Sequence, residues 1–227
     1  MPAAPLKTEL EELLKTRRLQ LEQPPLRDEE PRLQVRSGIA PLDNLIRGFP
    51  RGQLSEISGT ASSGRTGVAL SLLARASAAG ALVAWIDPAD RFDPASAAAC
   101  GAVLERVLWL RGGPLADSLS AAGTLLGAGL FEAIVLDFAA ALPAELRRLP
   151  GSTWIRLQRR AADTRTALLL LASEHVATGP GGARVELQAA RPRWSGNGPG
   201  RLLRGLDATL TAGRHALGRA SFTLHAL

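Results

Sequence analysis

One segment of the chain has the residue types and spacing of a phosphate-binding loop. The sequence Gly59-Thr-Ala-Ser-Ser-Gly64-Arg65-Thr66 follows an apolar run at residues 54–58 and precedes a helical pattern at residues 67–79. A strand, a glycine-rich loop and a helix in this order form a P-loop, which points backbone amides at phosphate oxygens. Together with one aspartate discussed below, the predicted nucleotide contacts are Gly59, Ser62, Ser63, Gly64, Arg65, Thr66 and Asp137.

Arg65 is the unusual residue of this loop. The P-loop pattern has a lysine there, whose compact ammonium reaches the phosphates, whereas arginine is a larger, planar group. The charge is kept, so attraction for phosphate could survive while catalytic placement suffers. The hydroxyl of Thr66 is the expected magnesium ligand. We predict a degenerate site with no resident cofactor, for which ATP or ADP with magnesium are possible ligands.

An acidic residue at the end of another apolar run completes the predicted site. Asp137 follows the apolar residues 133–136. P-loop proteins use a carboxylate at the end of a buried strand to hold hydrated magnesium. A single aspartate at a strand end could equally cap a turn, but its combination with the loop favours a place in the nucleotide site.

Composition narrows the class of protein. The chain has 227 residues, 46% of them hydrophobic, which suffices for one well-buried core. Cys100 is the only cysteine and the three histidines show no ligand spacing, so we predict no disulfide and no metal site. No apolar run approaches the ~20 residues that span a membrane, and residues 1–14 lack the apolar core of a signal peptide. We expect a cytoplasmic protein without membrane contact.

Positive charge is concentrated in the C-terminal half. The segment 147–219 carries thirteen arginines and four acidic residues, whereas the whole chain has a net charge of +6. Such a basic region could attract phosphate or an acidic partner. Because the chain has only two lysines, a solvated arginine-rich surface is the alternative. The candidate DNA-binding residues are Arg147, Arg148, Arg156, Arg159 and Arg160.

The N-terminal residues are predicted to be separate from the core. Residues 1–22 fit an amphipathic helix, whose apolar face could dock on its own domain or on another chain. Three prolines and four charges within residues 23–31 favour an extended linker, assigned to residues 23–36. The candidate partner-binding residues of the helix are Leu6, Leu10, Leu13 and Leu14.

Alternating strand and helix patterns predict an α/β core domain at residues 37–227. Continuous apolar runs indicate buried parallel strands at residues 54–58, 82–86, 107–110, 133–137 and 167–172. After residue 179, alternating patterns indicate antiparallel edge strands at residues 184–194, 206–211 and 221–224. The predicted fold is a mostly parallel central sheet flanked by helices, with antiparallel edge strands at its C-terminal end.

Residues 37–211 resemble the RecA recombinase core. Three segments carry the resemblance in the family's order, at residues 38–52, 86–94 and 137–142. The resemblance implies a RecA-like core around the P-loop. It also implies a use for the N-terminal helix, because RecA protomers join by lending an N-terminal segment to the neighbouring core. We therefore hypothesise that residues 1–22, or the groove that receives them, bind RecA or cap its filament.

Several positions depart from a working recombinase. Besides Arg65 in place of lysine, Ala89 stands where the family has the glutamate that activates water, although Asp90 could partly substitute. Ser96 replaces the aromatic that stacks on adenine, and Glu174 replaces the glutamine that senses the γ-phosphate. The segment 175–183 is much shorter than the recombinase's mobile DNA-binding loop, so we do not expect strand exchange.

A shortened RecA-like core with an altered nucleotide site resembles the ImuA family of accessory proteins in the bacterial mutasome. The resemblance implies a non-catalytic role in the SOS response to DNA damage, in SOS mutagenesis and translesion synthesis. It implies three protein partners, namely RecA, an ImuB-type polymerase-like subunit and an error-prone DNA polymerase, with single-stranded DNA as a further candidate. The alternatives are a weak DNA-stimulated ATPase, in which Arg65 and Asp90 replace the usual groups, and a DNA-binding recombinase paralogue.

Overall fold

A computed structural model describes residue 12 and residues 33–178, 181–213 and 218–225. The predicted N-terminal helix, with Leu6, Leu10, Leu13 and Leu14, lies outside these residues apart from Glu12, which is helical. Within the described parts of the chain, every helix is too short or too polar to cross a membrane.

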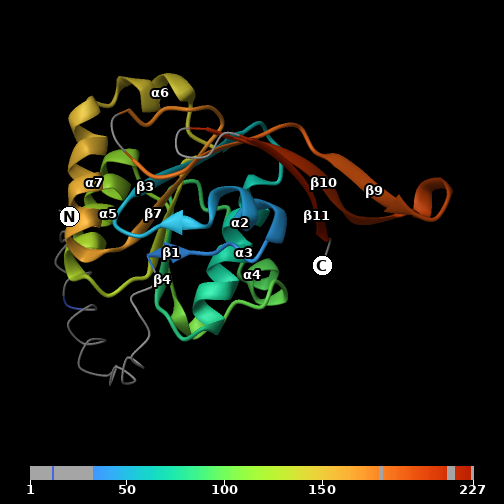
Figure 1. The fold of residues 1–227 in the computed structure, drawn as a ribbon, viewed down its shortest axis with the longest axis horizontal. Coiled ribbons are helices and arrows are strands. Elements are labelled where there is room, and N and C mark those ends of the chain that lie inside the picture. The colour runs from blue at the N-terminus through green and yellow to red at the C-terminus, as the bar shows by residue number, and fades with distance from the viewer. Residues whose placement is uncertain (1–11, 13–32, 179–180, 214–217, 226–227) are drawn as a thin grey trace, which may run out of the picture.

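The described residues form a nine-stranded sheet at the centre of the molecule (Figure 1). Its strands are β3 (Leu54–Gly59), β4 (Val83–Asp87), β5 (Val107–Arg111), β6 (Ala133–Asp137), β7 (Ala167–Ala172), β8 (Arg184–Leu187), β9 (Arg191–Ser195), β10 (Leu202–Gly213) and β11 (Gly218–His225). The spatial order is β11-β10-β8-β3-β7-β6-β4-β5, with β9 paired to β10 beside this path. The six strands from β8 to β5 run parallel, whereas β9, β10 and β11 pair antiparallel.

Helices cover both faces of the sheet and create two cores. The helices are α2 (Ala40–Ile46), α3 (Arg65–Ala78), α4 (Pro94–Ala99), α5 (Leu115–Ala128), α6 (Pro143–Arg148) and α7 (Gly151–Thr164). One core joins the sheet to α2, α3 and α4, with Leu72 fully buried. The other joins it to α5, α6 and α7, with Leu125 fully buried. The strands β3, β4, β6 and β7 between them are therefore buried on both faces, as parallel sheets require.

The predicted fold class is confirmed, and the buried strands agree closely with the sequence-based ranges. The predicted bounds of β6 and β7 are those of the structure, and the ends of β3, β4 and β5 differ by one residue. These strands are readable from sequence because burial on two faces leaves an uninterrupted apolar run.

The prediction of a single strand at residues 184–194 was wrong. β8 ends at Leu187, which pairs with Gly59, the last residue of β3. Beyond that point β3 offers no partner, and the chain continues as β9, which pairs with β10 alone. The strand predicted at residues 206–211 therefore begins earlier, at Leu202, because its first half has β9 as its partner.

The packed body begins before the predicted boundary at residue 37. The short strand β1 (Gln34–Val35) pairs antiparallel with β2 (Phe49–Pro50). Val35 and Phe49 are both buried in the core on the α3 side. Residues 34 and 35, which fall in the predicted linker, thus belong structurally to the core.

Replacement of Trp154 tests the second core. This side chain lies on α7, is 2% exposed and packs among the residues of α5, α6 and the sheet. We expect Trp154→Ala to lower the free energy of unfolding by about 3–5 kcal/mol in urea titrations, because it leaves a large cavity. The matched control is Ile155→Ala on the same helix, where the side chain is 39% exposed and the expected change is about 0.5 kcal/mol or less. Equal losses in the two variants would contradict the packing described here.

Candidate nucleotide-binding site

The carboxyl ends of four parallel strands meet at one edge of the sheet. β3 ends at Gly59, β6 at Asp137 and β7 at Ala172, and β4 ends at Asp87. In open α/β sheets, ligands bind just outside this edge. The topology therefore brings the P-loop and the predicted magnesium aspartate, which are far apart in sequence, to the same place.

The loop has the tight backbone of a phosphate cradle. Positive φ values occur at Ser62 and Gly64, at 60° and 93°. A Cβ at Gly59 would lie 2.6 Å from the hydroxyl of Ser63 and 2.7 Å from the carbonyl oxygen of Leu187, so only glycine fits there. The Ser63 hydroxyl is buried and has no hydrogen-bond partner among the described residues. A buried hydroxyl of this kind would suit a ligand oxygen, and Thr66 lies exposed in the first turn of α3.

Arg65 turns back into its own loop. Its Nη1 donates to the carbonyl oxygen of Gly59, the first residue of the loop, and its Nη2 donates to that of Ala139 at 3.4 Å. Burial lowers the pKa of Arg65, the negative charge of Asp137 opposes this shift, and the positive charge of Arg91 adds to it. The guanidinium thus connects the start of the P-loop to the segment that follows β6.

Asp137 is 9% exposed and lies at the end of β6. Its Oδ1 accepts a hydrogen bond from the backbone N–H of Ala139, at 3.3 Å. Burial raises the pKa of Asp137, and the charge of Asp87 raises it further, whereas the Ala139 hydrogen bond, Arg65 and Arg91 lower it. The carboxylate therefore lies in a poorly solvated environment, where the positive charges of Arg65 and Arg91 stabilise its ionised form.

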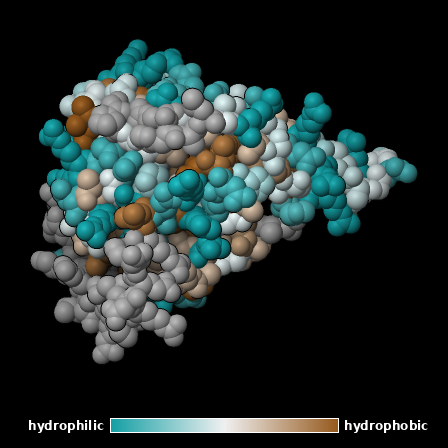
Figure 2. All heavy atoms as spheres, in the orientation of Figure 1, coloured by the Kyte–Doolittle hydropathy of each residue, from teal (hydrophilic) through white to brown (hydrophobic). Residues whose placement is uncertain are grey.

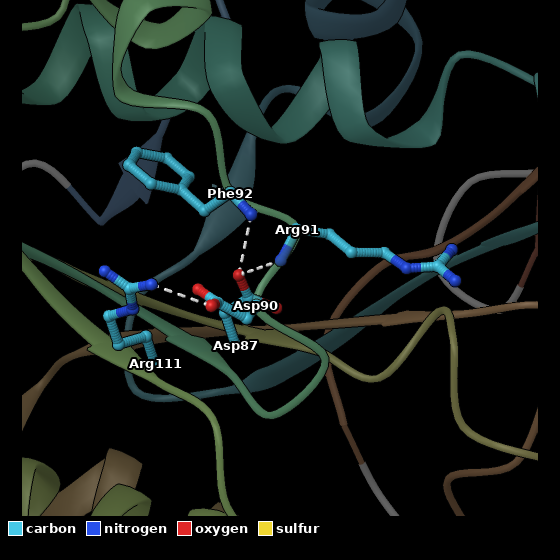
Figure 3. A network of polar contacts seen from close by, with 5 residues as sticks. All are labelled: Asp87, Asp90, Arg91, Phe92 and Arg111. Atoms are coloured by element: carbon cyan, nitrogen blue, oxygen red, sulfur yellow. Dashed lines mark hydrogen bonds and ion pairs between the residues drawn. The ribbon is translucent and has the colours of Figure 1, made fainter.

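A second buried aspartate, Asp87, lies beside it and was missed by the sequence analysis. Figure 3 shows its carboxylate turned toward the backbone that follows β4, where Oδ2 accepts from the N–H groups of Arg91 and Phe92, both at 2.6 Å. Its Oδ1 is buried without a partner among the described residues. An available clue was its position after the apolar run 82–86, which is the pattern that singled out Asp137.

Asp90, the predicted partial substitute for the missing glutamate, forms an ion pair with another side chain. Its Oδ2 lies 2.8 Å from Nη2 of Arg111 on β5, and Figure 3 shows the two side chains facing each other. The Arg111 guanidinium also lies over the ring of Trp109, 4.7 Å from its centroid. Ala89, in the adjoining turn, is exposed and has no proton acceptor in its side chain.

Ser96 and Glu174, the other two departures from the recombinase pattern, also bind partners within the chain. The Ser96 hydroxyl donates to Oδ2 of Asp93 at 2.5 Å, at the N-terminus of α4. Glu174 forms an ion pair with Arg147 of α6. Neither side chain offers the aromatic face or the neutral amide that the family uses at these positions.

Glu56 is a further polar residue that sequence reasoning missed. It lies in β3 and is 3% exposed. Its carboxylate accepts from the backbone N–H groups of Val176 and Ala177, at 2.7 and 3.3 Å, and pairs with Nδ1 of His175. These contacts hold the segment that follows β7 against β3, in the middle of the sheet. A charged residue in the middle of the predicted buried strand 54–58 was the sequence clue.

The five candidate DNA-binding arginines differ in their surroundings. Arg147 is paired with Glu174, and Arg160 donates from Nη1 to the carbonyl oxygen of Gly123 at 2.7 Å, which ties α7 to α5. Arg148, Arg156 and Arg159 lie on α6 and α7, and all five side chains are exposed. All five therefore have the accessibility that contact with a phosphate backbone requires, although Arg147 and Arg160 already bind partners within the chain.

Comparison with known proteins agrees with this arrangement. Residues 29–162 match the model of the RecA N-terminal domain. The chain belongs to the RecA N-terminal domain family. The match includes the P-loop, Asp87 and Asp137, so the site described above lies within the part shared with that family.

Individual RecA proteins show the same partial similarity. The chain is 38% identical to RecA of Rubrobacter xylanophilus over 117 residues, which are 51% of this chain and 34% of that protein. It is 37% identical to RecA of Streptococcus pyogenes serotype M49 over 136 residues, 58% of this chain and 36% of the relative. RecA of Lactobacillus delbrueckii subsp. bulgaricus is 35% identical over 130 residues, 56% of this chain and 39% of the relative. The matched part spans little more than a third of these relatives.

The environment of Asp137 predicts a pH-dependent effect of its charge. Since burial raises its pKa above the usual 3.8, Asp137 favours folding when protonated, and this contribution is lost as pH rises through the folded-state pKa. Asp137→Asn stays neutral at every pH. We therefore expect the free energy of unfolding of this variant, relative to that of the unchanged chain, to increase as the pH rises from about 4 to about 7. Urea titrations across this range would measure the difference. A difference that shrinks with rising pH would contradict the prediction.

Proposed function

We propose that this chain is a non-catalytic RecA-like accessory protein of the ImuA type, acting in SOS mutagenesis and translesion DNA synthesis. It works by contacts with RecA and with an ImuB-type polymerase-like subunit, beside an error-prone DNA polymerase. Membership of the RecA family supports a role connected with DNA repair or recombination. The altered nucleotide site supports a role that does not depend on ATP hydrolysis.

The position of Arg65 is the observation that carries this proposal. The guanidinium is bound to the carbonyl oxygen of Gly59 and lies near the charge of Asp137. The positive charge that would meet a phosphate is thus already satisfied within the protein. A nucleotide that drew Arg65 away would leave Asp137 with less compensating charge, and uncompensated buried charge is strongly unfavourable.

Hydrolysis would also lack the groups that act on the attacking water and the γ-phosphate. Ala89 has no proton acceptor, and the nearby Asp90 is held by Arg111. Glu174 is negative and would repel the γ-phosphate, and its ion pair with Arg147 holds it against α6. Should a nucleotide enter, Thr66 and Asp137 are the residues that would hold magnesium, whose charge would offset that of the phosphates.

Arg65→Lys tests whether the arginine closes the site. We expect calorimetry to show ADP and ATP binding at least about tenfold tighter than in the unchanged chain, because lysine frees the Gly59 carbonyl and restores a compact ammonium. Hydrolysis should remain absent, since Ala89 is unchanged. Arg75→Lys, exposed near the other end of α3, is the matched control and should leave binding unaltered. Turnover by the unchanged chain that Asp137→Ala abolishes would contradict the proposal and favour an ATP-driven mechanism.

The second candidate function is a DNA-binding recombinase paralogue or a weak DNA-stimulated ATPase. The exposed Arg148, Arg156 and Arg159 favour it, because they present three positive charges on neighbouring helices. Contacts of this kind with phosphates would weaken steeply with salt and independently of base sequence. Repeating the calorimetry and the hydrolysis assay with single-stranded DNA separates this function from the accessory role.

Removal of residues 1–22 tests the proposed contact with RecA. If Leu6, Leu10, Leu13 and Leu14 dock on a RecA core, the shortened chain should bind RecA at least about tenfold more weakly, because it lacks the apolar helical face. Binding to surface-immobilised RecA measures the effect. Equal thermal unfolding curves for the two chains are the control. Full retention of RecA binding would refute this role for the helix.

A further inference from the structure

One part of the protein projects away from the two cores. The strands β9 and β10, with the short 3-10 helix Gly198–Gly200 at their turn, extend as a ribbon beyond the body in Figure 1. We refer to residues 191–207 as the arm. Among the described residues, seven large hydrophobic side chains are exposed, and three of them, Trp194, Leu202 and Leu203, lie on the arm. An exposed cluster of this kind commonly marks an interaction site.

The pairing register gives the arm one apolar face. Trp194 lies opposite Leu203, and Pro192 lies opposite Leu206. Residues opposite each other in antiparallel strands share a face, so these four side chains line the same side of the ribbon. The guanidinium of Arg201 lies 4.8 Å from the centroid of the Trp194 ring at the outer end. Trp194 and Leu203 remain 46% and 41% exposed, so much of the apolar face is accessible although Arg201 covers one side of the Trp194 ring.

The opposite face is polar and basic apart from Leu202, which lies opposite Ser195. Arg193 Nη1 lies 3.9 Å from Oδ1 of Asp207, and Arg204 donates from Nε to the hydroxyl of Ser195 at 2.7 Å. The arm carries four arginines, at 191, 193, 201 and 204, and a single acidic residue, Asp207. Figure 2 shows predominantly hydrophilic residues along the side of the arm that is turned to the viewer. The arm thus combines an uncovered apolar face with excess positive charge.

We propose that the arm is a docking element for an acidic protein partner. Its apolar face enters an apolar groove of the partner, and its arginines meet carboxylates on the rim of that groove. Tryptophan and arginine are the residues that most often dominate protein–protein binding energy. Beyond residues 205–207, which also pair with β11, the arm is a two-stranded ribbon that gains little stability by itself, so an apolar face there is better explained by a partner. The inference rests on the proposed accessory role, which requires such partners.

Two other occupants fit the arm less well. A second copy would bring two arms of the same positive charge together, which is repulsive. Single-stranded nucleic acid would stack bases on an open ring face, but Arg201 already covers one face of Trp194. Pro192, Leu203 and Leu206 on the same side would also offer nothing to phosphates. An acidic protein uses both the apolar face and the arginines.

The test compares the full-length chain with two arm variants in biolayer interferometry, with RecA, the ImuB-type subunit and a single-stranded oligonucleotide as separate analytes. We expect the double variant Trp194→Ala, Leu203→Ala to bind at least one of the two proteins about tenfold or more weakly. The variant Arg201→Glu, Arg204→Glu should weaken the same contact most at low salt. Leu104→Ala, 38% exposed on the body, is the matched control and should bind normally. Thermal unfolding of all variants checks that the core is intact.

The outcomes separate this inference from the function on which it rests. Binding of neither protein by the unchanged chain would overturn the proposed function and the docking role with it. Binding of RecA or the subunit that both arm variants retain within about twofold would overturn the docking role alone. Loss of binding only to a single-stranded oligonucleotide, with both protein contacts retained, would make the arm a nucleic-acid element and would also overturn it.

Discussion

Burial of both faces of the parallel sheet is the constraint on which the rest of this structure depends. Parallel strands connected by helices are stable only where helices cover both sides, and α3 and α4 cover one face while α5 and α7 cover the other. The same connections bring all carboxyl ends to one edge. Gly59, Asp87 and Asp137 therefore lie at the same edge although the chain separates them widely, and two buried carboxylates are gathered there.

Those charges are balanced by the protein itself. Asp87 and Asp137 are both buried, and burial raises the pKa of Asp137. Arg65 supplies compensating charge to Asp137 from the first turn of α3, and its planar fork reaches the carbonyl oxygens of both Gly59 and Ala139. A lysine ammonium could not span the two in the same way. The substitution that removes the usual phosphate-binding group thus also links the P-loop to the loop after β6 without a ligand.

Sequence predicted the features that depend on long patterns and missed those that depend on single contacts. β6 and β7 were predicted with their bounds because two-sided burial leaves continuous apolar runs. The break between β8 and β9 was missed because it reflects where β3 ends, which local alternation does not reveal. Asp87 and Glu56 were missed because each is one polar residue at or within an apolar run. The partners of Arg147 and Arg160 could not be read from spacing, since both come from distant segments.

The arm and the nucleotide site are parts of one continuous sheet. β10 pairs with β9 over its first half and with β8 over its second, so the arm extends directly from a buried strand. At the base of the arm, Leu206 pairs with Leu224 of β11, and a Cβ added to Gly64 would lie 2.8 Å from Cδ1 of Leu224. The apolar face of the arm therefore starts on the side of the sheet that carries α3 and the P-loop. A partner seated on that face would therefore approach the altered phosphate site from the side of the sheet that carries α3.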